Sequence, residues 1–554
     1  MDDTTSLVKL KGWYASGRLS RRDFLRQSTL LGMSAGAAYA FTGLAAPQSA
    51  RAADLPRGGT LRMGMRVLDI SNPHAITFDE GGAPVRAVCD YLVRTGQDNI
   101  TRPWLLRRWE ASDDLRSWTL YLREGVKWHN GRPLLADDVA WNIAHVLDPE
   151  TGSSVLGLMG AYMLNEVATG ATGDDGNPVT RSELWDANAI EKIDDLTVRL
   201  NLKIPQTAVP EHLFHFPFFM LDPEEDGKFG VGSNGTGGWT LVEHGVGERA
   251  VMERVPGTHF MGDVHLDRIM IIDFGEESSA VMGALLNDQV DGIYELSETQ
   301  APMLEQADHL RIYRADTALT ALARGKVTQP PFDDPRVMRA IRHATDGQAV
   351  VDRALRCAAS LGDHTHVSPI HPEWVDLEPY DFDIAKARAL LAEAGYPDGL
   401  DLDFVVKTQP AWELDVAQVM IEDWAKAGIR AALQTVPASV YWDNWLEYPF
   451  SLTAWGHRPL APMVLSLAYR TGASWNESEF SNETFDRLLT EISGTVDPDE
   501  RQRITGELMA IMREEGPIVQ PYFMQVATAY NSRVKGFRMH PTKYIFFDEM
   551  AIEG

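Results

Sequence analysis

The chain has 554 residues, of which 44% are hydrophobic and 23% charged, and its formal net charge is −28. A chain of this length exceeds what one hydrophobic core supports, so two or more lobes are expected. A surface this acidic repels nucleic acid and anionic lipid, which excludes a polyanionic partner such as nucleic acid.

The first 52 residues are predicted to be an export signal rather than part of the fold. Residues 20–25 (S-R-R-D-F-L) have the pattern of a twin-arginine signal, and an uncharged run rich in small residues follows over 28–46. Residues 50–52 (A-R-A) have small side chains where a signal peptidase reads them, so cleavage is expected near Ala52-Ala53. A membrane anchor is the alternative, because the run is almost long enough to span a bilayer. We expect export by the twin-arginine translocase and a periplasmic location.

The only cysteines are Cys89 and Cys357. An exported protein can form disulfides, but each of these cysteines lies in a helix-like run far from the other. A bond between them would tie distant regions together, so two buried free thiols are expected.

The N-terminal half is predicted to combine strands, turns and a helix. Residues 58–67 and 118–122 alternate apolar and polar side chains, as half-buried strands do. An Asn-Gly pair marks the tip of a hairpin over 123–131, and two acids begin a helix over 137–147, where they favour the helix dipole. The glycine- and aspartate-rich stretch 169–183 is expected to be a surface loop.

The C-terminal half is predicted to alternate helices and strands. The short apolar strand 267–275 is expected to cross between lobes. Aspartates that cap helices precede two of the later elements. The expected elements are helices over 336–345, 384–394 and 412–427 and strands over 401–406 and 429–436. This βαβ order predicts an α/β lobe.

Several segments, in order along the chain, match the motifs of one protein family. They are residues 122–134 (LREGVKWHNGRPL), 235–241 (GTGGWTL), 332–341 (FDDPRVMRAI) and 383–399, which ends in AGYPDG. Together they resemble the ABC-transporter substrate-binding proteins of the peptide/nickel class, called family 5. The resemblance covers nearly the whole chain after the signal, although Gly238 stands where the family usually has proline.

The resemblance implies an α/β protein with the two-lobed periplasmic-binding-protein type II fold and an extra subdomain inserted in lobe I. It implies a monomeric extracytoplasmic receptor that closes on its ligand and delivers it to the permease and ATPase subunits of an ABC importer. No catalysis and no cofactor are expected. The expected domains are the signal (1–52), lobe I (53–100), the inserted subdomain (101–190), more of lobe I (191–275), lobe II (276–515) and a return to lobe I (516–554).

The ligand-binding expectation rests on a departure from the family. In its peptide-binding members, a G-W-x-x-D segment supplies an acid that pairs with the ammonium of the peptide. Here Trp455 is kept, Gly456 and His457 follow, and Arg458 replaces the acid. A guanidinium repels an ammonium and pairs bidentately with a carboxylate or phosphate. We therefore expect a peptide-like or other small ligand with an anionic group at Arg458; the alternative is that Arg458 pairs with a surface acid.

Two further residues are expected at the ligand. The resemblance places Trp442, like Trp455, on the cleft wall, where an aromatic face packs on apolar or sugar-like parts of a ligand. Any single aromatic residue of this region is otherwise a core residue. Asn72, in the loop after the first strand, is expected to reach the cleft from lobe I.

The sequence gives less support to other functions. His364, His366 and His371 suggest a metal site, but their spacing is loose, no Cys or acid completes a set, and histidines are common in surface loops, so no metal is expected. A nickel- or haem-type receptor, or a receptor for sugar or opine conjugates, would have the same fold. An exported hydrolase is the remaining alternative, and the chain has no G-x-S-x-G, Walker or Rossmann motif.

Overall fold

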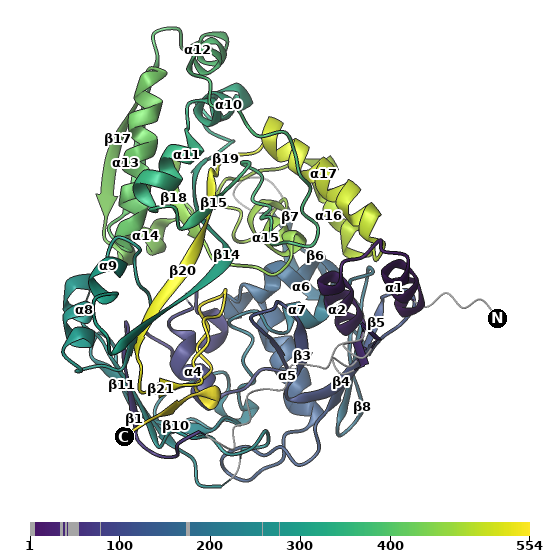
Figure 1. Cartoon of the computed structure of the whole chain (residues 1–554). Coiled ribbons are helices and arrows are strands. Elements are labelled where there is room, and N and C mark those ends of the chain that lie inside the picture. Colours follow the sequence, from purple (N-terminus) through teal and green to yellow (C-terminus); the bar gives the residue numbers. More distant parts are fainter. Residues whose placement is uncertain are drawn as a thin grey trace. The chain divides into compact units, whose positions relative to one another are not determined.

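A computed structural model describes residues 6–33, 37–38, 41–42, 55–77, 79–172, 178–257, 259–275 and 277–554 (Figure 1). The chain forms two compact units. Unit 1 comprises Met1–Glu295, Ala307–Tyr313 and Thr528–Gly554, and unit 2 comprises Leu296–Gln306 and Arg314–Ala527. The cleavage site predicted at Ala52-Ala53 and part of the run 28–46 lie outside the described residues.

The main sheet of unit 1 contains antiparallel and parallel strands. Its order is β10 (Trp239–Gly245), β11 (Arg249–Arg254), β12 (Arg268–Ile272), β1 (Thr60–Gly64) and β13 (Gly292–Ile293). β1 pairs in parallel with both β12 and β13, so the carboxyl ends of these three strands lie at one edge. The first strand is confirmed, but the prediction that 267–275 crosses between lobes is wrong, because β12 lies between two strands of unit 1.

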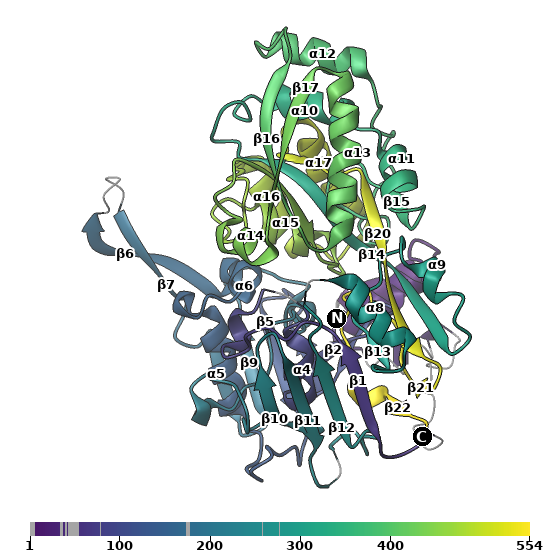
Figure 2. The same cartoon turned by 90° about the vertical axis from the view of Figure 1, so that its left-hand side faces the viewer.

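Smaller sheets complete unit 1. A four-stranded sheet has the order β4 (Leu106–Ala111), β5 (Ser117–Leu122), β9 (Thr197–Asn201) and β8 (Ile190–Asp194). The two-stranded ladders are β2 (Val93–Thr95) with β3 (Thr101–Pro103), β6 (Leu164–Thr172) with β7 (Pro178–Leu184), and β21 (Val534–Lys535) with β22 (Ala551–Ile552). The expected loop over 169–183 is therefore largely paired backbone (Figure 2), because β6 pairs antiparallel with β7 as far as Thr172 and Pro178. Residues 173–177 of this stretch lie outside the described residues.

The helical segments of unit 1 include the predicted helix after the hairpin. They are α1 (Ser6–Ala15), α2 (Arg21–Leu30), η2 (Pro73–Ala75), α4 (Gly82–Val88), α5 (Ala136–Leu147), η3 (Pro149–Thr151), α6 (Val155–Met163), α7 (Val209–His212), η4 (Pro223–Glu225), α8 (Ser278–Leu286) and η6 (Phe547–Glu549). Within the described ranges, no helix is both long enough and apolar enough to cross a membrane.

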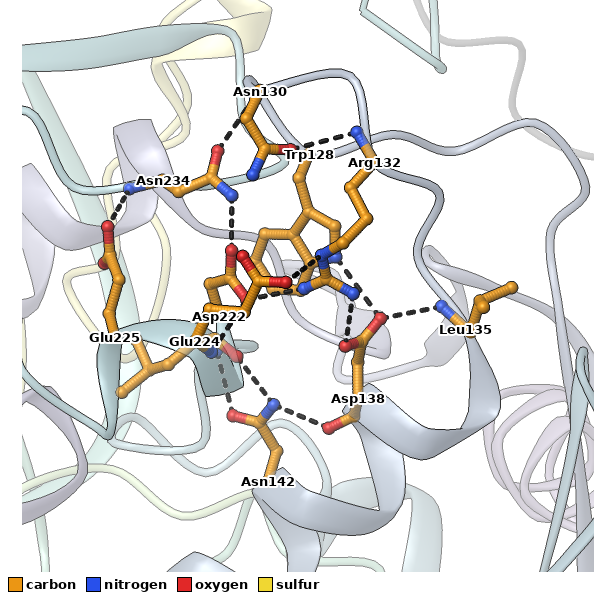
Figure 3. Close-up of polar contacts among 11 residues, drawn as sticks. Trp128, Asn130, Arg132, Leu135, Asp138, Asn142, Asp222, Glu224, Glu225 and Asn234 are labelled. Atoms are coloured by element: carbon orange, nitrogen blue, oxygen red, sulfur yellow. Dashed lines mark hydrogen bonds and ion pairs between the residues drawn. The ribbon is translucent and has the colours of Figure 1, made fainter.

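The family-like segment 122–134 is held by charged side chains rather than left open for a ligand (Figure 3). Arg132 donates to Asp138 at 2.7 Å and to Asp222 at 2.5 Å, and both carboxylates are almost fully buried. The Trp128 indole donates to Asp138 at 3.3 Å. A buried carboxylate needs such partners, so this motif fixes the start of α5 and has a structural role.

The strands of unit 2 pair in both antiparallel and parallel fashion. Their order is β20 (Tyr522–Asn531), β14 (Leu310–Gly325), β18 (Phe450–Trp455), β16 (Leu400–Lys407) and β17 (Ile429–Val436), with β15 (Ala359–Leu361) on β20 and β19 (Ile518–Val519) on β14. Both β14 and β20 begin in one unit and end in the other, so they are the strands that carry the chain between units.

The helices of unit 2 confirm the predicted βαβ order. They are α9 (Ala301–Leu304), α10 (Pro335–His343), α11 (Gly347–Ala349), the π-turn η5 (Val350–Ala354), α12 (Ile384–Glu393), α13 (Ala411–Lys426), α14 (Ala438–Asn444), α15 (Ala461–Tyr469), α16 (Glu483–Ser493) and α17 (Pro498–Glu514). Asp334 and Asp383 cap α10 and α12, each accepting a backbone N–H at 2.9 Å. Buried Trp424 of α13 meets Phe404 of β16 at a ring distance of 5.1 Å, which packs the helix on the sheet.

The two cysteines differ in environment. Both are free, as predicted, and Cys89 is buried. Cys357 is exposed, so the prediction that both thiols are buried is wrong. The helix-like run around Cys357 ends before it, and the residue has a positive φ of 65° just after η5, which places it in a turn.

Candidate ligand site

The segment with the predicted site residues leaves the end of β18 in unit 2. Trp455 is the last residue of this strand and lies opposite Thr320 of β14. Gly456, His457 and Arg458 follow as irregular backbone before α15 begins at Ala461. The antiparallel pairing of β18 with β14 therefore fixes the point from which these side chains project.

Trp455 is buried, and its indole nitrogen makes a hydrogen bond inside the protein. Only 3% of the residue is exposed, and its Nε1–H donates to the Glu477 carboxylate at 2.9 Å. Its ring meets those of His366 and Trp475 edge-on, at centroid distances of 5.7 and 5.9 Å. The indole nitrogen is thus used inside the protein, and only the ring surface remains to contact a ligand.

Glu477 holds the Trp455 side chain in place through a buried hydrogen-bond network. The sequence did not reveal this network. One carboxylate oxygen accepts from Arg324 Nε at 2.9 Å and from Thr453 Oγ1 at 2.7 Å. Arg324 is fully buried and also donates to the Tyr448 carbonyl at 2.5 Å. The one signal in the sequence is a charged residue directly after the apolar run of β14, since a buried charge requires a partner.

His457 and Arg458 are both buried, with exposed fractions of 2% and 8%. His457 Nδ1 accepts the Ala318 N–H of β14 at 3.0 Å, which ties the segment back to the sheet. The Arg458 guanidinium donates to the carbonyls of Gly456 and His457 at 3.3 and 3.0 Å. The side chain therefore folds over its own segment instead of extending into solvent.

The three histidines considered for a metal are buried, whereas a surface loop was expected. His364 Nδ1 accepts the Gln520 N–H at 2.9 Å, and His371 Nε2 lies 3.0 Å from the Arg458 carbonyl. His366 Nδ1 bonds the Tyr469 hydroxyl at 2.7 Å, while its Nε2 has no partner among the residues described. No group of three potential metal ligands is formed by the positioned part of the chain. These rings hold backbone and side chains together, which explains their burial.

Trp442 is connected to Trp455 by a series of aromatic contacts. It is half-buried on α14, and edge-on ring contacts run from Trp442 to Trp445 (5.7 Å), from Trp445 to Trp475 (6.1 Å) and on to Trp455. Lys407 Nζ lies 5.0 Å from the Trp442 ring and is paired with buried Glu413. The structure therefore brings the two predicted tryptophans into one aromatic wall.

Asn72 belongs to unit 1. It is exposed, precedes η2, and donates from its side chain to the Thr151 carbonyl at 3.4 Å. Its contact with a ligand stays a prediction.

The sequence matches a family model over residues 101–477, described as bacterial extracellular solute-binding proteins, family 5, middle. The chain belongs to this family. It is a solute-binding receptor of the kind that serves an ABC importer, and the members of this family are extracytoplasmic binding proteins.

Curated relatives of this family 5 receptor cover most of its length. Heme-binding protein A of Haemophilus influenzae is 24% identical over 82% of this chain and 84% of the relative. The dipeptide-binding protein DppE of Bacillus subtilis is 23% identical over 93% and 97%, respectively. The glutathione-binding protein GsiB of Salmonella paratyphi A is 24% identical over 81% and 86%.

Solved structures confirm the fold class. The binding protein AgaA of A. tumefaciens, in complex with agropinic acid, has a TM-score of 0.77 at 21% identity and covers 90% of this chain and 99% of that one. NikZ of Campylobacter jejuni, in complex with Ni(L-His), has a TM-score of 0.75 at 18% identity over 89% and 99%. The expected two-lobed type II fold is therefore correct.

Proposed function

We propose that this receptor binds a small ligand through an anionic group held at Arg458. The observation that carries the proposal is a buried guanidinium, three residues after Trp455, on a segment fixed at both ends. His457 bonds β14 on one side, and His371 bonds the Arg458 carbonyl on the other. A positioned cation in a low-dielectric site attracts an anion more strongly than an exposed one does.

The relatives support an anionic cargo without naming it. Agropinic acid, bound by AgaA, and glutathione, for which GsiB is named, both carry carboxylates. Trp442 and Trp455 would pack on the rest of the ligand, because aromatic faces bury apolar and sugar-like groups well. Gly456, whose carbonyl accepts from the guanidinium, is proposed to lie beside the ligand, and Asn72 is proposed to contribute a polar contact from unit 1.

The proposal also includes the route of export. A twin-arginine signal at residues 20–25 would carry the folded chain to the periplasm, followed by cleavage near Ala52-Ala53. Arg21 and Arg22 are exposed on α2, whereas Phe24 and Leu25 are buried. The mature receptor would act as a monomer and pass its cargo to the permease and ATPase subunits of the importer.

Native mass spectrometry of the receptor purified from its own periplasm tests both parts. A mass that matches a chain beginning at Ala53 supports cleavage of the export signal. A co-purified anionic compound supports the proposed ligand class. For that compound, Arg458→Ala should weaken binding about 10- to 100-fold, because a hydrogen bond to a charged group contributes about 1.5–3 kcal/mol. Arg458→Lys should fall between, since it keeps the charge but loses the planar fork.

The control is Arg336→Ala in the same unit. Arg336 is exposed and paired with Asp334 at the start of α10, so its removal should leave affinity unchanged. Equal affinity of wild type and Arg458→Ala in calorimetric titration would contradict the proposal, as would a co-purified ligand without an anionic group.

A further inference from the structure

The segment predicted to be the export signal lies against the rest of unit 1. Its helix α2 packs on β3 and α7, two elements that follow the predicted cleavage site (Figure 1). Most of the helix is buried, including Phe24 and Leu25 of the signal motif, which are 0% and 5% exposed. A helix of ten residues is barely stable in water by itself, so these contacts are what hold α2 in place.

Trp109 of β4 makes a directional contact with this helix. The residue is 3% exposed, and its indole Nε1–H donates to the Leu30 carbonyl at 2.7 Å. Leu30 is the last residue of α2, and the final carbonyls of a helix have no partner within the helix. The part of unit 1 beyond the signal therefore supplies a donor that the end of the signal helix needs.

Gly32 brings the chain after α2 directly against the same tryptophan. Gly32 has a positive φ of 94°, and the N–H of Met33 donates to the Ser28 carbonyl at 2.9 Å, a common way for a glycine to end a helix. A Cβ atom at this position would lie 2.5 Å from the Trp109 carbonyl oxygen. Any side chain here would therefore push the signal away from β4.

Apolar side chains extend the contact. Leu25 packs with Ala38 and Ile100, and Met33 lies against this group. Ile100 precedes β3 and is 2% exposed, so the signal segment covers an apolar residue of the loop between β2 and β3. The face that contains Ile100 and Trp109 is called the signal-docking surface below.

The arginine pair of the signal stays accessible while the residues after it are covered. Arg21 and Arg22 are exposed at the start of α2, whereas Phe24 and Leu25 are buried. Apolar side chains that are already out of water gain little free energy by entering a membrane or a receptor groove. The docked signal can therefore be contacted at its arginines, but its apolar part cannot be inserted until it leaves the surface.

We propose that the signal-docking surface is a binding site for the chain's own export signal, and that the folded receptor is exported only after residues 24–33 leave this surface. The inference rests on the proposed export route and adds a step to it. Docking keeps the apolar part of the signal out of water between folding and export, and release makes it available to the translocase.

Hydrogen exchange of the full-length chain, read by mass spectrometry over residues 24–33, measures docking. Wild type should exchange slowly there, because an undocked helix of this length opens constantly. Gly32→Ala should speed the exchange at least about tenfold, since the added methyl group meets the Trp109 carbonyl. Trp109→Phe should speed it about three- to tenfold, which corresponds to the loss of one hydrogen bond.

These two variants change opposite sides of the contact. Gly32→Ala leaves every residue after the predicted cleavage site as it is, so the mature receptor is the same as wild type. Trp109→Phe leaves the signal as it is, so an effect shared by both variants comes from the contact itself. Both should also shorten the half-time of export in a pulse-chase measurement by at least about twofold, because the undocked state is more populated.

The chain offers a matched control for each variant. Gly17 also has a positive φ, of 78°, but among the described residues no atom beyond its chain neighbours lies within 4 Å of a Cβ there. Trp185 also donates its indole N–H to a backbone carbonyl, that of Asn201 at 2.7 Å. Gly17→Ala and Trp185→Phe should leave both the exchange over residues 24–33 and the half-time of export as in wild type.

The outcomes separate this inference from the proposed function. Rapid exchange over residues 24–33 in wild type, or unchanged exchange in either Gly32→Ala or Trp109→Phe, would overturn the inference. Faster exchange without faster export would overturn the requirement for release. Replacing both Arg21 and Arg22 by lysine should stop export and leave the exchange unchanged. Continued export of that double variant would contradict the twin-arginine route, while the docking measured by exchange would stand.

Discussion

The polar network around Glu477 in unit 2 and the polar side chains around Tyr294 in unit 1 (Arg66, Glu80, Arg86, Glu295 and Lys543) are of similar kinds but differ in how fully their hydrogen bonds are satisfied. Each combines an arginine, carboxylates and aromatic rings. In unit 2, both Glu477 oxygens accept from buried donors, and the Tyr441 hydroxyl bonds Thr453 at 2.6 Å. In unit 1, the Tyr294 hydroxyl and Arg86 Nε are left without acceptors among the described residues.

This difference bears on how rigid each region is. A satisfied network in a low-dielectric interior becomes rigid, because every group that moves leaves another one unpaired. We therefore assign the Glu477 network to holding the aromatic wall.

The largest expected effect comes from breaking the satisfied network. Arg324→Met leaves the Glu477 carboxylate buried without its cation. Such a change should reduce the free energy of unfolding by about 3–5 kcal/mol. Urea unfolding followed by tryptophan fluorescence measures it, because Trp455 and Trp475 lie in the same region.

Two controls accompany this variant. Arg324→Met with Glu477→Met removes both charges, so it should recover part of the lost stability. Arg503→Ala removes an exposed arginine that pairs with Glu500, and should change stability by less than about 1 kcal/mol. A cost for Arg324→Met as small as that of Arg503→Ala would show that the network does not hold the wall.

Local patterns in the sequence predicted much of unit 2. The elements β16, α13 and β17 were expected within one residue or so of their ends, because apolar periodicity and capping residues are local signals. The roles of Trp455 and Arg458 at a ligand were inferred from a family motif and stay predictions. Arg324 and Glu477 were not found, because they are 153 residues apart and no local pattern relates them.

The wrong predictions from the sequence have the same origin, which is contact between segments far apart in the chain. Residues 267–275 have the composition of any buried strand, so the sequence could not show that β12 has neighbours from unit 1 on both sides. The histidines looked like loop residues, but hydrogen bonds from distant segments, such as Gln520 to His364, bury them. Tyr294 was not singled out, because an unpaired hydroxyl is visible only in three dimensions.

A smaller effect is expected from a matched pair of histidines, one in each unit. Burial lowers the pKa of His212 in unit 1 and of His366 in unit 2 to about 3. Both rings bond a tyrosine hydroxyl through Nδ1. Since the folded state keeps each ring neutral while the unfolded chain takes up a proton below its pKa of about 6.5, stability is complete above that pH and falls as the pH decreases.

Each histidine should add a slope of about 1.4 kcal/mol per pH unit to the loss of stability below about pH 6. His212→Gln and His366→Gln should each flatten the dependence of the unfolding free energy on pH between 6 and 4, measured in urea at several pH values. Unchanged slopes in both variants would mean that the rings are protonated in the folded state. A changed slope in one variant alone would show that the interiors of the two units differ in how fully they exclude water from the histidine ring.

The smallest effect concerns the two thiols, which again contrast the units. Cys89 in unit 1 is 1% exposed, and burial together with Asp90 raises the pKa of its thiol well above the ordinary value. Cys357 in unit 2 is exposed, and its thiol lies 3.5 Å from Asp352, which raises its pKa.

A thiol reagent such as Ellman's reagent should therefore titrate one thiol per native chain and two in guanidinium chloride, since only the thiolate reacts. Asp352→Asn should speed the first reaction by removing the neighbouring charge, while Cys357→Ser should leave stability within about 0.5 kcal/mol of wild type. Rapid reaction of both thiols in the native receptor would mean that unit 1 opens around Cys89, and the interior that encloses Tyr294 would then be less closed than its burial indicates.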